Sequence, residues 1–156
     1  MLKVSDIMIS DVVSVSPSAP AIEIAQKMKE TGLGMVTVCN DGKYKGAITE
    51  GDIVTKVVAK AYNPKREHAR SLMRIQYPTV APWDDLGGVA EQMLRKGIRV
   101  MPVVQNGKLL GVLTLDSLLR ENPALSDALL VRNSENAPVE EAGCGTSKVM
   151  TYVCQI

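Results

Sequence analysis

Aromatic residues are nearly absent from this 156-residue chain, which contains no phenylalanine and only 3% aromatic side chains. Hydrophobic residues nevertheless make up 46% of the sequence, which is enough apolar material for a sizeable core. That core must therefore be aliphatic and filled by methionine. The length suits one compact domain, or two small ones that share a core.

No charge of one sign dominates either. The formal net charge is +1, and basic and acidic residues are mixed along most of the chain. Nucleic-acid-binding domains usually carry a basic stripe, so this balance argues against a surface for polyanions. The segment Lys56 to Arg74 is modestly basic, but it has no interleaved aromatic residue beyond Tyr62 and is more typical of a solvated connector. A nucleic-acid or protein interaction module stays open as an alternative.

Long apolar runs are missing as well. No run approaches the roughly 20 residues that a membrane span needs. The first residues, Met1 to Asp6, lead directly into patterned sequence without the features of a signal peptide. We therefore expect a soluble, cytoplasmic protein without membrane association.

Cysteine and histidine are too scarce for the usual disulfide or catalytic frameworks. The three cysteines, Cys39, Cys144 and Cys154, are too few for a disulfide scaffold. The one histidine, His68, lies in the polar stretch 63–70, and no Ser-His-Asp or Cys-His arrangement can be assembled around it. No glycine-rich phosphate loop is present. These absences give little support to an enzyme.

An internal repeat is the strongest signal in the sequence. Gly46 and Gly111 lie 65 residues apart, and each precedes two apolar residues and a threonine. The same offset aligns further identical pairs without a gap, among them Met8 and Met73, Val15 and Val80, Pro17 and Pro82, Gly32 and Gly97, and Thr49 and Thr114. These identities fall on glycines, turn residues and apolar positions, where backbone geometry and packing restrict the choice of residue.

Each copy of the repeat predicts the same order of elements, β-α-β-β-α. The first helix begins near Ala21, with Ile22, Ala25 and Met28 on one face. In the second copy Asp84 is the predicted N-cap. The apolar stripe that follows it has helical spacing and consists of Leu86, Val89, Ala90, Met93 and Leu94.

The remainder of each copy predicts a hairpin and a second helix. Gly32 and Gly97 should end the first helices, and second helices should start at about Asp52 and Asp116. Between them we expect strands at 35–39 and 47–48 in the first copy and at 100–104 and 112–113 in the second. The turns contain Asp-Gly and Asn-Gly, the pairs that tolerate positive φ.

The stretch Gly46 to Asp52 ends the first of these hairpins with a polar pair. Thr49 and Asp52 lie three residues apart at a helix start. They could cap the helix, or they could present polar groups to a ligand over its N-terminal end. The residues by themselves leave both readings open.

The repeated unit resembles a known family. Its Gly-hydrophobic-hydrophobic-Thr-x-x-Asp ending and the run Gly-Ile-Arg-Val-Met-Pro-Val-Val at 97–104 resemble the CBS domain, and two copies in register resemble a CBS pair, or Bateman module. The resemblance covers roughly Val4 to Asn122. It implies an α/β (α+β) fold of tandem β-α-β-β-α repeats packed with pseudo-two-fold symmetry. The expected parts are a first repeat at 1–58, a linker at 59–71, a second repeat at 72–123, and a C-terminal helix and tail at 124–156.

The resemblance also implies two related clefts that commonly hold adenosine compounds. By carry-over, Asp52 and Thr49 would hold the ribose, and Arg99 would reach the phosphate. The adenine would be walled by side chains from the second repeat's strand and from the loop before its first strand: Ile98, Val100, Met101 and Pro102, with Arg74, Tyr77, Pro78 and Thr79.

The second cleft departs from the pattern. Ser117 stands at the position equivalent to Asp52, and the nearby carboxylate, Asp116, is one residue early, about 100° around a helix. Gly34 stands where the first cleft has Arg99. The remaining residues assigned to this cleft are Met35 and Thr114. We therefore expect weak or absent nucleotide binding there, or a different ligand.

The function that the resemblance implies is regulatory. We expect a stand-alone module that binds AMP, with ADP and ATP as further candidates, as a regulatory ligand, without a required cofactor and without enzyme activity. A homodimer and an unknown regulated protein would be its partners. S-adenosylmethionine is the alternative ligand, although its cationic sulfonium suits Arg99 less well than a phosphate does.

The tail leaves three readings open. A short helix is expected at 124–131. Cys144 and Cys154 resemble the two knuckles of a small zinc ribbon, but Glu141 occupies one expected cysteine position, and tetrahedral zinc needs four ligands. A degenerate ribbon, a disulfide between the two cysteines and a disordered tail are the alternatives.

Overall fold

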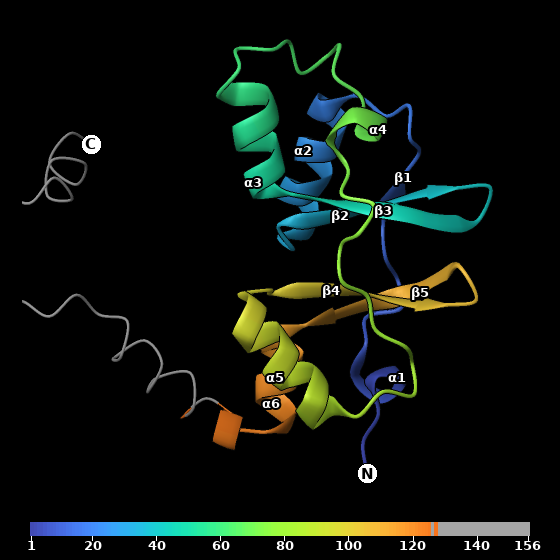
Figure 1. The fold of residues 1–156 in the computed structure, drawn as a ribbon, viewed down its shortest axis with the longest axis vertical. Helices are drawn as coiled ribbons and strands as arrows, with labels where there is room; N and C mark the ends of the chain where they lie inside the picture. The colour runs from blue at the N-terminus through green and yellow to red at the C-terminus, as the bar shows by residue number, and fades with distance from the viewer. Residues whose placement is uncertain (126, 128–156) are drawn as a thin grey trace, which may run out of the picture.

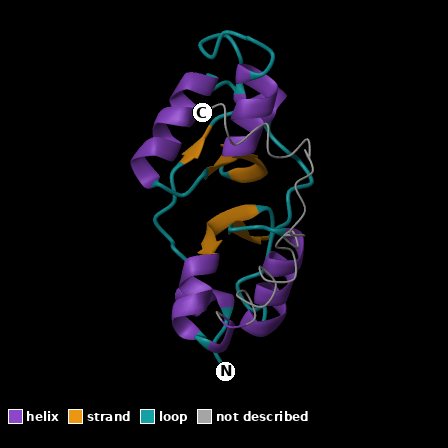
Figure 2. Ribbon diagram, turned by 90° about the vertical axis from the view of Figure 1, so that its left-hand side faces the viewer, coloured by secondary structure: helices purple, strands orange, loops and turns teal. Residues whose placement is uncertain are grey.

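The computed structural model describes residues 1–125 and 127. It shows two stacked halves, each with a small sheet whose outer face is covered by helices (Figure 1). The two sheets face each other across the middle of the molecule (Figure 2). Strand order is β1-β2-β3 in the first half and β4-β5 in the second. The expected α+β architecture of two packed repeats is confirmed.

The elements of the two halves follow the repeat. The first half contains β1 (Ser14–Val15), α2 (Ala21–Thr31), β2 (Met35–Asn40), β3 (Lys43–Thr49), α3 (Glu50–Ile53) and the π-helix η1 (Val54–Val58). The second contains α5 (Leu86–Lys96), β4 (Val100–Gln105), β5 (Lys108–Thr114) and α6 (Leu115–Glu121). Two one-turn helices, α1 (Val4–Ile7) and α4 (Ala69–Leu72), precede the repeats.

Local signals account for the hairpin turns and helix ends. Asp41 and Asn106 have φ of 51°, each followed by a glycine with positive φ, as the turn pairs predict. The helices α2 and α5 end at Gly32 and Gly97 in the left-handed conformation, which confirms both predicted stops. The tips of the two hairpins meet, because the Tyr44 amide donates to the Gly107 carbonyl at 2.8 Å.

The details of the first helices differ from the prediction. The N-cap of α5 is Asp85, whose side chain accepts from the Gly88 amide at 3.0 Å. Asp84 instead accepts from the amide of Ala81, in the turn before the helix. Both aspartates can satisfy backbone donors, so the sequence could not decide between them.

The buried face of α2 is also rotated from the expected one. Its buried residues are Ala21, Ile24 and Met28, while Ile22 and Ala25 are only half-buried. An apolar residue at nearly every early position of this helix gives two stripes that share Met28. The residues that pack against α2 decide which of the two stripes is buried. In the first core these are residues of the strands and of α4.

The short helices are exchanged between the halves. Val4 of α1 belongs to the core of the second half, and Leu72 of α4 belongs to the core of the first. Matching hydrogen bonds hold them: the Ser5 amide donates to the Pro82 carbonyl, and the Arg70 amide to the Pro17 carbonyl, both at 2.9 Å. The predicted boundaries of the repeats and the linker, at residues 58, 71 and 123, stay a prediction. The packing of the short helices crosses the division between the two repeats.

The two repeat glycines allow close backbone crossings. At Gly46 a Cβ would lie 2.7 Å from the Arg74 carbonyl oxygen, and at Gly111 it would lie 2.5 Å from the Ile9 carbonyl oxygen. These crossings are paired as bridges, Ala47 with Arg74 and Ile9 with Val112. The exchange therefore places Arg74, which precedes the second repeat's strands, against β3 of the first.

The cores are aliphatic, as the composition predicts. Each half has its own cluster, and a smaller third cluster lies between the sheets. That third cluster consists of Met35, Ala47, Val100 and Val112, and Tyr77 packs against it. Within the described part of the chain, none of the helices combines the length and apolar character of a membrane span.

Candidate ligand cleft between the halves

A cleft of about 540 Å³ opens between the halves, where α2 and α5 end and where β2 and β4 begin. Among the residues predicted for the first site, six line it: Thr49, Arg74, Tyr77, Ile98, Arg99 and Val100. Four residues assigned to the second site line the same cleft: Gly34, Met35, Thr114 and Asp116. The two predicted sets therefore meet in one space.

Six further lining residues were not predicted for either site. These are Gly32, Leu33, Glu50, Gly51, Lys96 and Gly97. The repeat contained a signal for part of this set, since Leu33 is equivalent to Ile98 and Gly32 to Gly97. The Glu50 side chain lies over Gly34, where a Cβ would come within 3.2 Å of the carboxyl carbon. A glycine at 34 thus leaves room for this carboxylate.

Other predicted site residues are not among those that line this cleft: Asp52, Pro78, Thr79, Met101, Pro102 and Ser117. Met101 is fully buried in the core of the second half. The Pro102 carbonyl accepts from the Val80 amide at 3.0 Å, so this part of β4 is joined to the strand segment at 80. Their ligand roles stay predictions.

Thr49 and Asp52 form a capping box at the start of α3. The Asp52 amide donates to Thr49 Oγ1 at 3.3 Å, and Asp52 Oδ2 accepts from both the Thr49 amide and the Thr49 hydroxyl at 3.0 Å. Two backbone donors at the helix start are thereby satisfied. Because Thr49 is the cap, α3 begins at Glu50, two residues before the position expected from the sequence.

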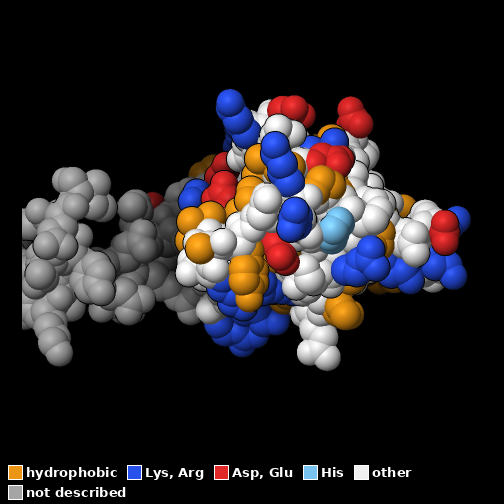
Figure 3. Space-filling model, turned by 90° about the horizontal axis from the view of Figure 1, so that it is seen from above, with side chains coloured by type: hydrophobic (Ala, Val, Ile, Leu, Met, Phe, Trp, Pro, Cys, Tyr) orange, Lys and Arg blue, Asp and Glu red, His pale blue; other side chains and the backbone are white. Residues whose placement is uncertain are grey.

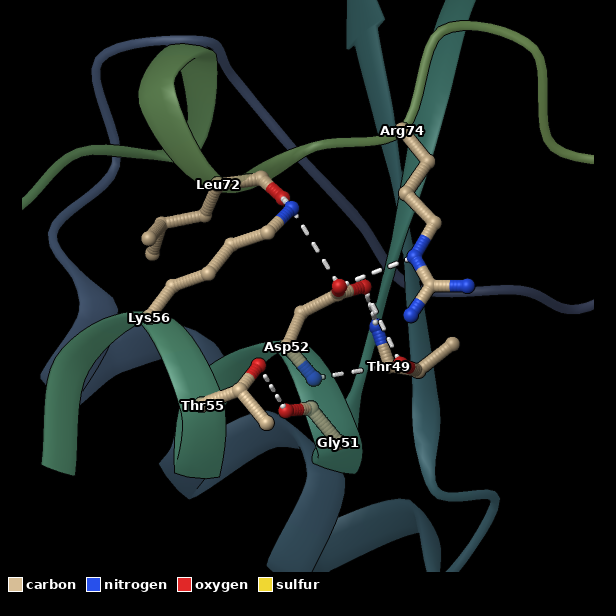
Figure 4. Close-up of polar contacts among 7 residues, drawn as sticks. All are labelled: Thr49, Gly51, Asp52, Thr55, Lys56, Leu72 and Arg74. Carbon is tan, nitrogen blue, oxygen red and sulfur yellow. Dashed lines mark hydrogen bonds and ion pairs between the residues drawn. The ribbon is translucent and has the colours of Figure 1, made fainter. Parts of the chain in front are cut away.

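The other oxygen of Asp52 binds two cations (Figure 4). Asp52 Oδ1 lies 2.9 Å from Arg74 Nε and 3.2 Å from Lys56 Nζ. Lys56 is one helical turn further on and also donates to the Leu72 carbonyl at 2.9 Å. The Asp52 side chain is only 1% exposed. A buried carboxylate is costly unless it is paired and hydrogen-bonded, and here it has both kinds of partner.

The surroundings of Asp52 also set its ionisation. Burial acts to raise the pKa of the carboxyl, but hydrogen bonds from the Thr49 backbone, Arg74, the Thr49 hydroxyl and Lys56 outweigh it. The net result is a pKa below the ordinary value, because these donors favour the charged form. Asp52 is therefore an anion at neutral pH.

Arg74 connects this buried anion to the cleft. Its side chain is 52% exposed, and it reaches Asp52 through Nε alone. Figure 4 marks a contact with the Asp52 carboxylate from Nε and none from the two terminal nitrogens of the guanidinium. Three residues later, the Tyr77 hydroxyl donates to the Val100 carbonyl at 3.0 Å, which ties this segment to β4.

The equivalent capping pair in the second half, Thr114 and Ser117, is uncharged. Thr114 caps α6 by accepting from the Ser117 amide at 3.1 Å, and the two hydroxyls lie 2.8 Å apart. The positions equivalent to Arg74 and Lys56 are Ile9 and Glu121. Among the described residues, the cluster of a carboxylate with two cations is therefore specific to the first half.

Charges on the surface of the first half are mixed. Seen from above, basic and acidic side chains are interspersed with polar and apolar ones (Figure 3). The predicted zinc or disulfide cysteines, Cys144 and Cys154, lie outside the described residues, as does most of the helix expected at 124–131.

Comparisons with known proteins agree with the architecture. The profile of the CBS domain matches residues 4–59 and 69–123. The uncharacterized protein MK0525 of Methanopyrus kandleri is 38% identical over 126 residues, which cover 80% of this chain and 64% of that protein. The chain thus spans about two thirds of that relative's length. Hypoxic response protein 1 of Mycobacterium tuberculosis is 27% identical over 124 residues, or 79% of this chain and 87% of that protein.

Solved structures show the same fold. A crystal structure of Hypoxic Response Protein I with two coordinated zinc ions has a TM-score of 0.70 at 28% identity, covering 78% of this chain and 100% of the other. The hexameric CBS-CP12 protein from bloom-forming cyanobacteria has a TM-score of 0.66 at 27% identity, covering 86% and 90%. With two matched domains that account for most of its length, this chain belongs to the CBS-domain family.

Proposed function

We propose that the cleft binds an adenine nucleotide as a regulatory ligand, with AMP as the first candidate and ADP and ATP next. CBS-domain pairs are typically regulatory and ligand-binding. The observation that carries the proposal is that Arg74 and Arg99, which flank opposite sheets, line one cleft. Guanidinium groups bind phosphate through paired hydrogen bonds, so two of them suit an anionic end of a ligand.

The rest of the cleft suits a nucleoside. Its volume of about 540 Å³ is within the usual range of small-molecule sites, about 300–1,000 Å³. Ile98 and Val100 supply apolar walls, and the ring of Tyr77 adds an aromatic one. The carboxylates of Glu50 and Asp116 are acceptors that sugar hydroxyls can reach. An apolar wall with a few polar groups is the usual composition of such a site.

A ligand in this position would act on the arrangement of the halves. It would touch residues on both sides of the cleft, so its affinity depends on how the halves sit together. A ligand shifts a conformational equilibrium only by its differential affinity for the two states. We propose that the chain forms a homodimer and that a regulated protein distinguishes its bound and free states. Light scattering after size exclusion, with and without AMP, tests the dimer.

Calorimetric titration of AMP, ADP and ATP tests the proposed ligand. Wild type should bind at least one nucleotide, and Arg99→Gln should weaken binding by about tenfold or more, the equivalent of one charge-assisted hydrogen bond. Arg95→Gln is the matched control, because Arg95 is an exposed arginine on α5 that does not line the cleft. Wild type that binds none of the three nucleotides would refute the proposal.

One observation favours a second ligand class. Glu50 and Asp116 place two carboxylates in the cleft, and these could face the sulfonium and amino groups of S-adenosylmethionine. If that compound is the ligand, Arg99→Gln should leave its affinity unchanged or raise it, because a cation is removed. The same titration series with S-adenosylmethionine therefore separates the two classes by the sign of the effect.

A further inference from the structure

The layer between the two sheets contains two buried hydroxyls without partners. Thr37 Oγ1 and the Tyr44 hydroxyl are shielded from solvent, and neither has a hydrogen-bond partner within the described residues. Both lie on the inner face of the first sheet, because Thr37 pairs with Ala47 of the third cluster and Tyr44 pairs with Cys39, two residues further along β2. A buried hydroxyl without a partner costs stability, so its presence calls for a physical explanation.

Tyr77 lies at the edge of this layer and near Tyr44. Its side chain lines the cleft and packs against the third cluster, and its hydroxyl donates to the Val100 carbonyl at 3.0 Å. Burial, and then the charge of Tyr77, raise the pKa of the Tyr44 hydroxyl, which indicates that the two phenol groups are neighbours. The Tyr77 hydroxyl therefore has a second acceptor nearby, and that acceptor is unused.

The present contact of Tyr77 obstructs a ligand. Met35 and Val100 line the cleft and also belong to the third cluster, so they form the apolar wall that a planar base would contact. Tyr77 packs on this same cluster, and a base on the wall would have to displace its ring. A hydroxyl that left the Val100 carbonyl without finding another partner would lower the affinity for the ligand.

We propose that Tyr44 is a positioning residue, whose hydroxyl accepts the Tyr77 hydroxyl when a ligand's base enters between the sheets. In this structure Tyr77 donates to the Val100 carbonyl. In the bound state Tyr77 donates to Tyr44, and the Val100 carbonyl accepts from the ligand. Both groups that are paired before binding are then paired after it. The inference rests on the proposed nucleotide site and concerns how that site opens.

The internal repeat supports this assignment independently of the contacts. At an offset of 65 residues, Tyr77 and Tyr44 correspond to Val12 and Leu109. Val12 packs against the third cluster, as Tyr77 does. Apolar side chains thus fill the equivalent positions, so packing of the sheets does not require the two hydroxyls. The two tyrosines occur together, as expected for residues that act on each other.

Calorimetric titration of AMP against wild type, Tyr44→Phe, Tyr77→Phe and the double variant tests the inference. Tyr44→Phe should weaken AMP binding by about 2- to 10-fold, the equivalent of one neutral hydrogen bond, although Tyr44 is not among the residues that line the cleft. Tyr77→Phe should stay within about twofold of wild type, because it removes one bond from each state. In that background Tyr44→Phe should cause no further loss. Unchanged affinity in Tyr44→Phe alone, or an equal loss in both backgrounds, would overturn the inference.

Stability measurements separate this role from a structural one. Thermal unfolding without ligand should show Tyr44→Phe to be more stable than wild type, because a buried hydroxyl without a partner is removed. Misfolding cannot account for lower affinity in a more stable protein. Thr37→Val is the matched control, since it removes the other such hydroxyl, and it should retain AMP affinity. Losses of equal size in Thr37→Val and Tyr44→Phe would contradict the role of Tyr44. Tyr44→Leu, which introduces the residue of the second half, supplies the test if Tyr44→Phe does not fold.

A second ligand keeps this inference distinct from the identity of the nucleotide. S-adenosylmethionine has the same adenine as AMP. If wild type binds this compound and none of the nucleotides, the nucleotide proposal is refuted, and Tyr44→Phe should weaken S-adenosylmethionine by the same factor of about 2 to 10. Wild type that binds AMP with an affinity that Tyr44→Phe leaves unchanged would refute this inference alone. Absence of binding for all these compounds would refute both.

Discussion

Replacing Gly46 by alanine should destabilise the fold at the point where the second repeat's leading segment crosses the first. The added Cβ would lie 2.7 Å from the Arg74 carbonyl oxygen and 3.2 Å from its carbonyl carbon. Both atoms are backbone, so no flexible side chain can move aside. Relief requires a shift of the segment at 74, which would weaken the two bridging hydrogen bonds, Arg74 amide to Ala47 carbonyl at 2.9 Å and the reverse at 3.2 Å.

Overpacking of this kind costs about 1–3 kcal/mol, which lowers the unfolding midpoint of a domain this size by about 2–4 °C for each kcal/mol. Far-UV circular dichroism during urea and thermal unfolding measures both quantities. The same shift displaces Arg74, so AMP affinity should fall as well.

Gly51→Ala is the matched control, five residues away in α3. Its Cβ would meet Thr49 Oγ1 at 3.7 Å, an ordinary contact, and alanine in place of a helical glycine stabilises by about 0.4–1 kcal/mol. The two glycine-to-alanine changes should therefore have opposite signs. A Gly46→Ala protein as stable as the Gly51→Ala protein would refute the close crossing.

Two further predictions concern a buried hydroxyl and the second core. Burial, and then the charges of Tyr77 and Cys39, raise the pKa of Tyr44 above its ordinary value of 10.0. As the pH rises, this hydroxyl therefore ionises in the unfolded chain before it ionises in the folded one. The free energy of unfolding should consequently fall as the pH rises above about 10. Tyr44→Phe should flatten this alkaline slope and raise stability at pH 7, because the buried hydroxyl has no partner; a slope equal to that of wild type in urea titrations would contradict the assignment. Met93 is fully buried in the second core, so Met93→Ala should cost about 2–5 kcal/mol, whereas Ile75→Ala, at a side chain 72% exposed, should stay within about 0.5 kcal/mol. Equal costs for these two variants in denaturant unfolding would refute the placement of Met93.

The features that the sequence predicted well are those decided within a few residues. A left-handed φ is available to glycine and to Asn or Asp in turns, so Gly32, Gly97 and the hairpin turns could be placed without any tertiary information. The choice of Asp84 as a cap was wrong because two adjacent aspartates offer the same chemistry, and only the path of the chain into α5 selects Asp85.

The sequence predicted which residues belong to the candidate site better than it predicted how they are arranged in space. The repeat and the family resemblance together led to Thr49, Arg99 and Asp116, and all three line the cleft. Glu50 and Lys96 also line it, although nothing in their local pattern distinguishes them from solvated surface charges. Their place follows from where two helices begin and end relative to the opposite sheet.

The sequence by itself determined the two β-α-β-β-α units, their turns and helix ends, and the aliphatic character of the cores, because each depends on local conformational preference or on composition. Only the tertiary structure decided the partners of Asp52. Its contact with Arg74 spans 22 residues and exists because the chain crosses β3 at Gly46, where no side chain blocks it. A carboxylate's role depends on which donors reach it, and that is set by the crossing, not by the motif in which the carboxylate lies.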